Sequence, residues 1–181
     1  DVFFVDINNG WVIGDIGVIL HTSDGGQHWE IQKSKVKHEL KALHFVDKNN
    51  GWLIGGSSLL NATLIPHIIL HTLDGGKNWE IQSKSPKLKG FSFNDIFFID
   101  MNNGWIVGGK AALSGLYGVI LHTSDGGKNW EIQNQSEKFK EHFMGVHFVD
   151  NQNGWAVGGH WEAGFIDVKY INGMIIYTSD G

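Results

Sequence analysis

The chain has 181 residues and a mass of 20.1 kDa, enough for one domain with a substantial core. Hydrophobic residues make up 41% and charged residues 18%, and apolar runs are short, so disordered and membrane-spanning classes are excluded. A net charge of -5 argues against nucleic-acid binding. The chain has no cysteine, which excludes disulfides and thiolate metal sites, and all 14 basic residues are lysines, which excludes sites that need arginine.

The first 32 residues predict four strands in succession. Residues 2–5 are apolar and aromatic, as in strands, and stop at an Asp-x-Asn-Asn-Gly turn. Asn-Gly favours a tight hairpin because both residues tolerate a positive φ. Further strands are expected at residues 11–14, 18–21 and 29–32, the last two separated by a Gly-rich turn.

Both turn segments recur along the chain. The first occupies residues 4–11, 45–52, 98–105 and 148–155; the second occupies 21–32, 71–82 and 122–133, and breaks off at 177–181. Four antiparallel strands per repeat are typical of propeller blades, and no helical period is sustained. We therefore predict an all-β fold, a single domain over residues 1–181 with about four β-propeller blades. The expected blades are 1–40, 41–92, 93–143 and 144–181, the fourth lacking its outer strand.

The second segment resembles the Asp-box, or bacterial neuraminidase repeat, of pattern Ser/Thr-x-Asp-x-Gly-x-Thr-Trp. Its positions here are Thr22, Asp24, Gly26 and Trp29; Thr72, Asp74, Gly76 and Trp79; Thr123, Asp125, Gly127 and Trp130; and Thr178 and Asp180. The seventh position departs from the pattern, being His or Asn. With the upstream Phe-x-Asp-x-x-x-Gly-Trp segment, the whole repeat is similar to the photosystem II stability/assembly factor family of β-propellers. The resemblance implies protein partners and an extracytoplasmic location, in the periplasm or at the cell surface.

The Asp-boxes themselves are expected to be structural. A Thr hydroxyl and an Asp carboxylate two residues apart can cap the N–H groups of a tight turn. Gly26 supplies a backbone conformation that other residues avoid, and Trp29 can bury its ring against a neighbouring blade. A catalytic residue is needed once, whereas a turn residue is needed once per blade.

Neither a metal site nor a cofactor is predicted. Asp6-x-Asn8-x-Gly10 resembles the start of a calcium loop in part, but its Gly comes one position early and Gly17 stands where the final Glu belongs. A hairpin turn explains the same residues. One His precedes each complete Asp-box, and these three are expected to be half-buried sheet residues on different blades: His21, His71 and His122.

No catalytic constellation is visible either. The paired carboxylates of a glycosidase could come from Asp15, Glu141, Glu162 or Asp167, but the spacing singles out no two of them. Asn61-Ala62-Thr63 fits the N-glycosylation pattern, which is short enough to arise by chance.

The loop lengths predict where a partner binds. From turn Asp to Trp the spacing is constant in both recurring segments, whereas the other two connections vary between copies. In an up-and-down blade these variable loops share one face, where binding is usual. The candidate binding residues are Lys35, Lys37, Lys87, Lys89, Trp161, Phe165 and Tyr170. Two alternatives stay open: the lysines are only solubilising, and the loop around Trp161 folds back to bury it.

The sequence thus favours a non-enzymatic scaffold that binds another macromolecule, a protein or else a carbohydrate. The alternative is a fragment of a carbohydrate-active enzyme of the xyloglucanase or sialidase type, with its catalytic residues outside this stretch. The chain starts inside strand-like sequence without Met, so we expect the natural N-terminus to be missing. Because an open stack of blades leaves sheet faces unpacked, we expect further sequence or self-association to complete the propeller.

Overall fold

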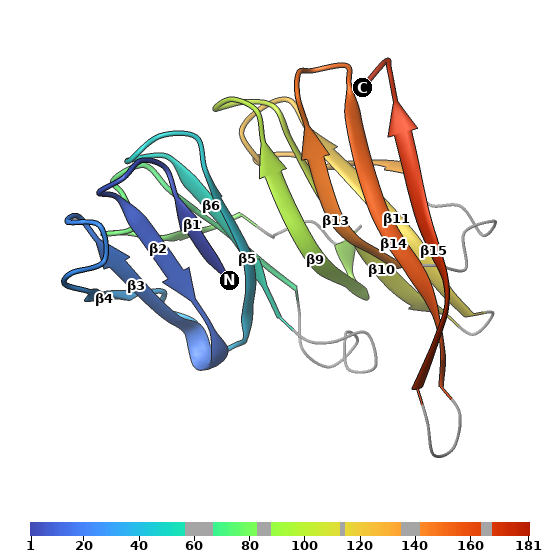
Figure 1. The fold of residues 1–181 in the computed structure, drawn as a ribbon, viewed down its shortest axis with the longest axis horizontal. Helices are drawn as coiled ribbons and strands as arrows, with labels where there is room; N and C mark the ends of the chain where they lie inside the picture. The colour runs from blue at the N-terminus through green and yellow to red at the C-terminus, as the bar shows by residue number, and fades with distance from the viewer. Residues whose placement is uncertain (57–66, 83–87, 113–114, 135–141, 164–167) are drawn as a thin grey trace.

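The computed structural model describes residues 1–56, 67–82, 88–112, 115–134, 142–163 and 168–181, and these form four antiparallel sheets (Figure 1). The first contains β1 (Val2–Phe4), β2 (Gly10–Ile13), β3 (Val18–Thr22) and β4 (Glu30–Lys33); the second β5 (Leu40–Phe45), β6 (Gly51–Gly55), β7 (Ile68–Thr72) and β8 (Glu80–Ile81); the third β9 (Phe91–Phe98), β10 (Gly104–Ala112), β11 (Gly115–Thr123) and β12 (Glu131–Asn134); the fourth β13 (His142–Phe148), β14 (Gly154–Ala163) and β15 (Val168–Thr178). One short 3₁₀ turn, η1 (Asp15–Gly17), precedes β3.

The all-β prediction is confirmed, including the incomplete last sheet. The second, third and fourth sheets begin at Leu40, Phe91 and His142, one or two residues before the expected blade boundaries. No helix among the described residues has the length and apolar character needed to cross a membrane.

The sheets stack in chain order, and the first strand of each lies closest to its neighbour. β5 contacts β1 and β9, and β9 also contacts β13. Three apolar cores fill the spaces between successive sheets. The N-terminus lies on the first sheet and the C-terminus on the fourth, at opposite sides of the stack (Figure 1).

An aromatic pair joins each sheet to the next. Trp11 on β2 stacks on Phe45 of β5, with ring centroids 3.6 Å apart and planes 9° apart. Trp52 stacks on Phe98, and Trp105 on Phe148, with nearly the same geometry. The Trp11 indole N–H donates to the carbonyl of Gly75, and that of Trp52 to Gly126. In the first two sheets the Trp of the second strand is therefore both an apolar and a polar link between blades, whereas Trp105 provides the stacking contact alone.

The hairpins between first and second strands differ from the Asn-Gly expectation. None of the four Asn-Gly pairs has a positive φ, so the predicted reason for the motif is wrong. In the first copy, the Asp6 carboxylate accepts the backbone N–H groups of Asn8 and Asn9, and Val5 N–H donates to the Asn9 carbonyl. Gly10 is required for another reason: a Cβ there would collide with the Phe4 ring.

The first strands alternate in sequence from sheet to sheet. Asp1 and Asp95 begin corresponding stretches in sheets one and three, where sheets two and four have Ala42 and Gly145. Each Asp carboxylate accepts a backbone N–H from the next sheet, Leu43 for Asp1 and Val146 for Asp95. Two residues further on, Phe and His alternate, and their rings lie 4.6–4.9 Å apart: Phe3, His44, Phe97 and His147.

Both outer sheets present apolar side chains to solvent. Ile31 on the first sheet is 80% exposed, and Ile175 on the fourth is 74% exposed. Phe4 and Trp155 are also exposed, although their counterparts in the middle sheets stack against a neighbour. Among the described residues, no further sheet packs against these two faces.

Candidate functional site

Each complete Asp-box is a closed hydrogen-bonded turn. In the second copy, the Thr72 hydroxyl donates to the Asp74 carboxylate (2.9 Å) and accepts the Gly76 N–H (2.8 Å). Asp74 also accepts the backbone and side-chain N–H groups of Asn78, both at 2.8 Å. The third copy repeats this pattern, and the first uses His28 in place of Asn78. In the fourth, Thr178 donates to Asp180.

These bonds keep the carboxylates of the three complete boxes ionised. The backbone N–H of His28, and then its ring, hold the pKa of Asp24 at about 2. Partial burial raises the pKa of Asp74 and Asp125, but their hydrogen bonds outweigh it and the net pKa of each is lowered. A carboxylate that is ionised and already accepts N–H donors is suited to stabilising a turn and not to transferring protons.

The hairpins and Asp-boxes interlock to form one face, which we call the constant face. Gly25 N–H donates to the Asn8 carbonyl, and the same bond joins the turns in the other three copies. Both carboxylate oxygens of Asp6 accept N–H groups of Asn8 or Asn9, so this residue caps the hairpin turn. Over the described part of the chain, no three His, Asp or Glu side chains gather as metal ligands.

The three Asp-box histidines are half-buried sheet residues, as expected. Each lies against the Trp of its own second strand: His21 on Trp11, and likewise in the next two sheets. Burial lowers the pKa of His21, so the ring tends to stay neutral.

The opposite face, the variable-loop face, carries three of the predicted lysines in described positions. Lys35, Lys37 and Lys89 are exposed, and Lys87 lies outside the described residues. Lys35 sits in a fixed turn, since the buried Ser34 hydroxyl donates to Gly17 and accepts the N–H of Val36. These bonds hold the backbone around Lys35 against η1.

Two further lysines, one on β10 and one on β5, contact side chains of β9. Lys110 places its Nζ 5.0 Å from the centroid of the Phe91 ring, a cation–π distance. Lys41 donates to the Ser92 hydroxyl at 3.2 Å. The repeated sequence pattern ends before Lys110, so the sequence does not indicate its contact with Phe91. The contact arises because β10 continues to Ala112.

The predicted loop around Trp161 is largely strand. β14 continues to Ala163 and β15 starts at Val168, and Trp161 pairs with Tyr170 through the backbone. Figure 1 shows this ribbon extending past the other hairpins. Phe165 lies outside the described residues. Lys35 and Lys37 belong to the first sheet's connector and Trp161 to the fourth sheet, so the structure does not gather them into one cluster.

The candidate hydrolase residues form no described pair. Glu141 and Asp167 lie outside the described residues, as does the Asn61-Ala62-Thr63 pattern. Asp15 is in η1, while the backbone of Glu162 pairs with Lys169 in the distant hairpin.

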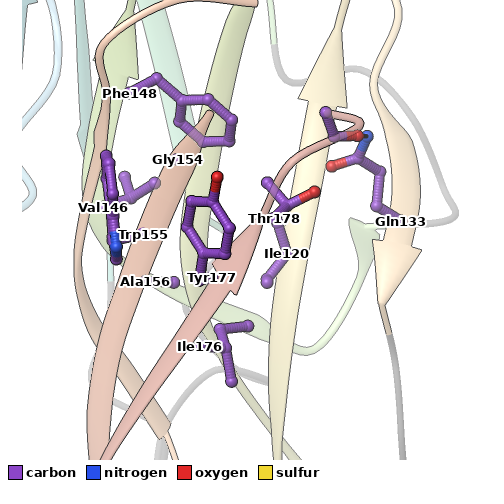
Figure 2. Close-up of a pocket in the computed structure, with 11 residues that line it drawn as sticks. Ile120, Gln133, Val146, Phe148, Gly154, Trp155, Ala156, Ile176, Tyr177 and Thr178 are labelled. Atoms are coloured by element: carbon purple, nitrogen blue, oxygen red, sulfur yellow. Dashed lines mark hydrogen bonds between the residues drawn. The ribbon is translucent and has the colours of Figure 1, made fainter. Parts of the chain in front are cut away.

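A cavity of about 420 Å³ lies between the third and fourth sheets (Figure 2). Ile120 and Gln133 line it from the third sheet, and Phe148, Ala156 and Ile176 from the fourth. Thr178 and Gly181 of the fourth Asp-box segment also line it.

Stacked antiparallel sheets with an Asp-box segment after the third strand of each define an Asp-box β-propeller. The chain belongs to the family of the photosynthesis system II assembly factor YCF48, whose sequence profile matches residues 1–92 and 82–166. The family prediction is confirmed.

Solved structures of that family share the fold. YCF48 from Cyanidioschyzon merolae is 24% identical, with a TM-score of 0.64 over 94% of this chain and 55% of that one. A structure of YCF48 bound to D1 peptide is 22% identical, with a TM-score of 0.58 over 88% of this chain and 59% of that one. The chain therefore spans somewhat more than half of their length.

Glycoside hydrolase propellers are more distant. The GH74 enzyme of Niastella koreensis is 14% identical, with a TM-score of 0.56 over 84% of this chain and 24% of that one. At such identity the likeness concerns the fold alone. No curated protein matches this sequence.

Proposed function

We propose that this chain is part of a non-enzymatic β-propeller that binds a protein partner through its variable-loop face. Membership of the YCF48 family carries the proposal. A relative is bound to D1 peptide, and we extend that kind of ligand, a peptide segment of a partner protein, to this chain. An extracytoplasmic location, in the periplasm or at the cell surface, is part of the same proposal.

The two faces differ in what they can offer a partner. On the constant face, carbonyls and carboxylates are largely used in bonds between the turns. On the variable-loop face, Lys35, Lys37 and Lys89 are exposed and loop length differs between blades. Variable loops on a rigid scaffold favour recognition.

The described residues do not favour the carbohydrate-active alternative. A retaining or inverting glycosidase needs two carboxyl groups at a set separation, and a sialidase of the resembled type needs arginines. The chain has no arginine, and the carboxylates of the three complete Asp-boxes accept N–H donors of their own turns.

Site-specific photo-crosslinking in cells of the native source tests the proposal. A photoreactive residue replaces Lys35, Lys37 or Lys89 on the variable-loop face. Matched positions on the constant face are the exposed Lys48, Lys77 and Lys128. We expect one protein to be crosslinked from the first set and not from the second. Crosslinking from the constant face alone, or to no protein from either, contradicts the proposal.

A further inference from the structure

A groove of about 690 Å³ lies at the constant face between the first and second sheets. One wall is β4 with the end of β3, and the other is formed by the hairpin and Asp-box turns of the second sheet. Gln32 joins the two walls, since its side-chain amide donates to the Gly75 carbonyl at 2.8 Å. A volume of this size lies within the range of small-molecule sites, roughly 300–1,000 Å³.

The side chains that face each other across this groove are polar and charged. On the first wall, Glu30 pairs directly with His21, so both side chains lie on the same face of the sheet, where His21 contacts Trp11. Lys48 and Lys77 come from the second wall. Burial lowers the pKa of His21, and the charges of Glu30 and Lys77 act on that pKa in opposite directions, so both groups lie near the ring.

These charges are not used within the protein. In the part of the chain that the structure describes, Glu30, Lys48 and Lys77 form no ion pair with another residue. Asp74 also lines the groove, but its carboxylate accepts the N–H groups of Asn78. The groove therefore offers a ligand two ammonium groups and one carboxylate that have no partner of opposite charge.

Lys48 is not required by the turn that carries it. The equivalent position of the other three hairpins holds a residue without charge: Ile7, Met101 and Asn151. At the next boundary between sheets, Met101 therefore stands where this groove has a lysine. The basic character of the second wall belongs to this one boundary, whereas the His and Glu of the first wall recur in the next two sheets as His71 and Glu80, and His122 and Glu131.

We propose that this groove binds a small sugar that carries one negative group, a carboxylate or a phosphate. Lys48 and Lys77 donate charge-assisted hydrogen bonds to the negative group. Glu30 accepts hydrogen bonds from sugar hydroxyls, and the neutral His21 ring can donate or accept one more. Because Glu30 repels a bare anion, hydroxyl donors and the negative charge have to be present on the same ligand. This site lies on the face opposite the one proposed for the protein partner.

Four probes that differ in one group each test the proposal: glucuronate, glucose 6-phosphate, glucose and inorganic sulfate. Each is titrated into the isotope-labelled chain, and amide NMR shifts are followed. We expect saturable one-to-one binding of at least one anionic sugar, with shifts at residues 21–33, 48–49 and 74–77. Glucose and sulfate should bind about fivefold or more weakly, because each lacks one of the two recognised groups. The tighter of the two anionic sugars identifies the negative group.

Matched variants locate the site. Lys48→Met copies Met101 and should weaken the anionic sugar about fivefold, whereas Lys128→Met removes the same charge outside the groove and should leave binding unchanged. Glu30→Ala should weaken the sugar but not sulfate, which has no hydroxyl to donate. Lys77→Met replaces Lys48→Met if the latter does not fold.

Three results overturn the proposal: no binding of either anionic sugar, equally tight binding of glucose or sulfate, or an equal loss in Lys128→Met. The crosslinking test concerns a protein on the other face, so the two proposals can fail separately.

Discussion

Trp52 and Phe98 stack across the boundary between the second and third sheets, with ring centroids 3.7 Å apart and planes 7° apart. The same indole donates its N–H to Gly126 of the next Asp-box at 3.0 Å. One side chain thus joins the inner strand and the outer turn of the following blade. The equivalent Trp105 keeps the stacking partner, Phe148, with the same spacing. The packing of one blade on the next therefore depends on the second-strand Trp. This Trp belongs to the same recurring sequence segment as the hairpin turn before it.

A side chain at Gly51, the residue before Trp52, is expected to destabilise the protein because it would overlap the Phe45 ring. Gly51→Ala places a methyl group on the Phe45 ring, so we expect a loss of about 2–3 kcal/mol, the usual cost of overpacking. Gly14→Ala is the matched control, because nothing lies within 4 Å of its added Cβ. Chemical denaturation measures both. Equal stabilities of the two variants would show that the ring moves aside freely.

Replacing an Asp-box Trp should cost more stability the more deeply its side chain is buried. Trp79→Ala leaves a cavity in a site that is 3% exposed, and we expect a cost of about 3–5 kcal/mol. Trp29, at 37% exposure, should cost distinctly less. Thermal unfolding of the two variants compares them directly, and a larger loss at Trp29 would contradict the packing argument.

The Asp-box carboxylate should act on stability and not on partner binding. Asp74→Ala removes three hydrogen bonds of its turn, and we expect a cost of about 1–2 kcal/mol. Partner binding should persist in the folded fraction. A folded Asp74→Ala protein with wild-type stability and no binding would reverse the structural assignment of the Asp-box.

Charge reversal should change the rate of partner association on the variable-loop face and not on the constant face. Changing Lys35, Lys37, Lys87 and Lys89 to Glu should slow association with an acidic partner several-fold at low salt and leave thermal stability nearly unchanged. Reversal of Lys48, Lys77 and Lys128 on the constant face is the control. Trp161→Ala should instead speed dissociation, as the loss of an interface anchor does. Unaltered rates for the first variant across a salt series mean that those lysines only aid solubility.

His44 should make the protein sensitive to mild acid. Burial lowers the pKa of His44 to about 4 in the folded state, against 6.5 for the free side chain. The unfolded chain therefore takes up this proton first, and stability falls as pH drops from 6.5 toward 4. His44→Phe, which copies Phe3 and Phe97, should remove about 1–2 kcal/mol of the loss between pH 7 and pH 5. Denaturation at these two pH values measures it; an unchanged loss would assign the sensitivity to other histidines.

The repeat made most of the fold predictable, because each blade restates the same strands and turns. Strand edges at residues 10–13 and 18–22 lie within one residue of the expected ones. The role of Gly10 was not predictable, since it depends on the Phe4 ring folding back across the hairpin. The sequence predicts a loop where β14 and β15 form a long ribbon, because these residues do not follow the repeated pattern.

The alternating first strands divide the stack unevenly. A carboxylate bridges the first boundary through Asp1 and the third through Asp95, whereas Ala42 brings none to the boundary between them. The second boundary is held instead by the largest of the three apolar cores, by Trp52 and by the Lys41–Ser92 hydrogen bond. Loss of either aspartate should therefore loosen one outer sheet and leave the two middle sheets packed together.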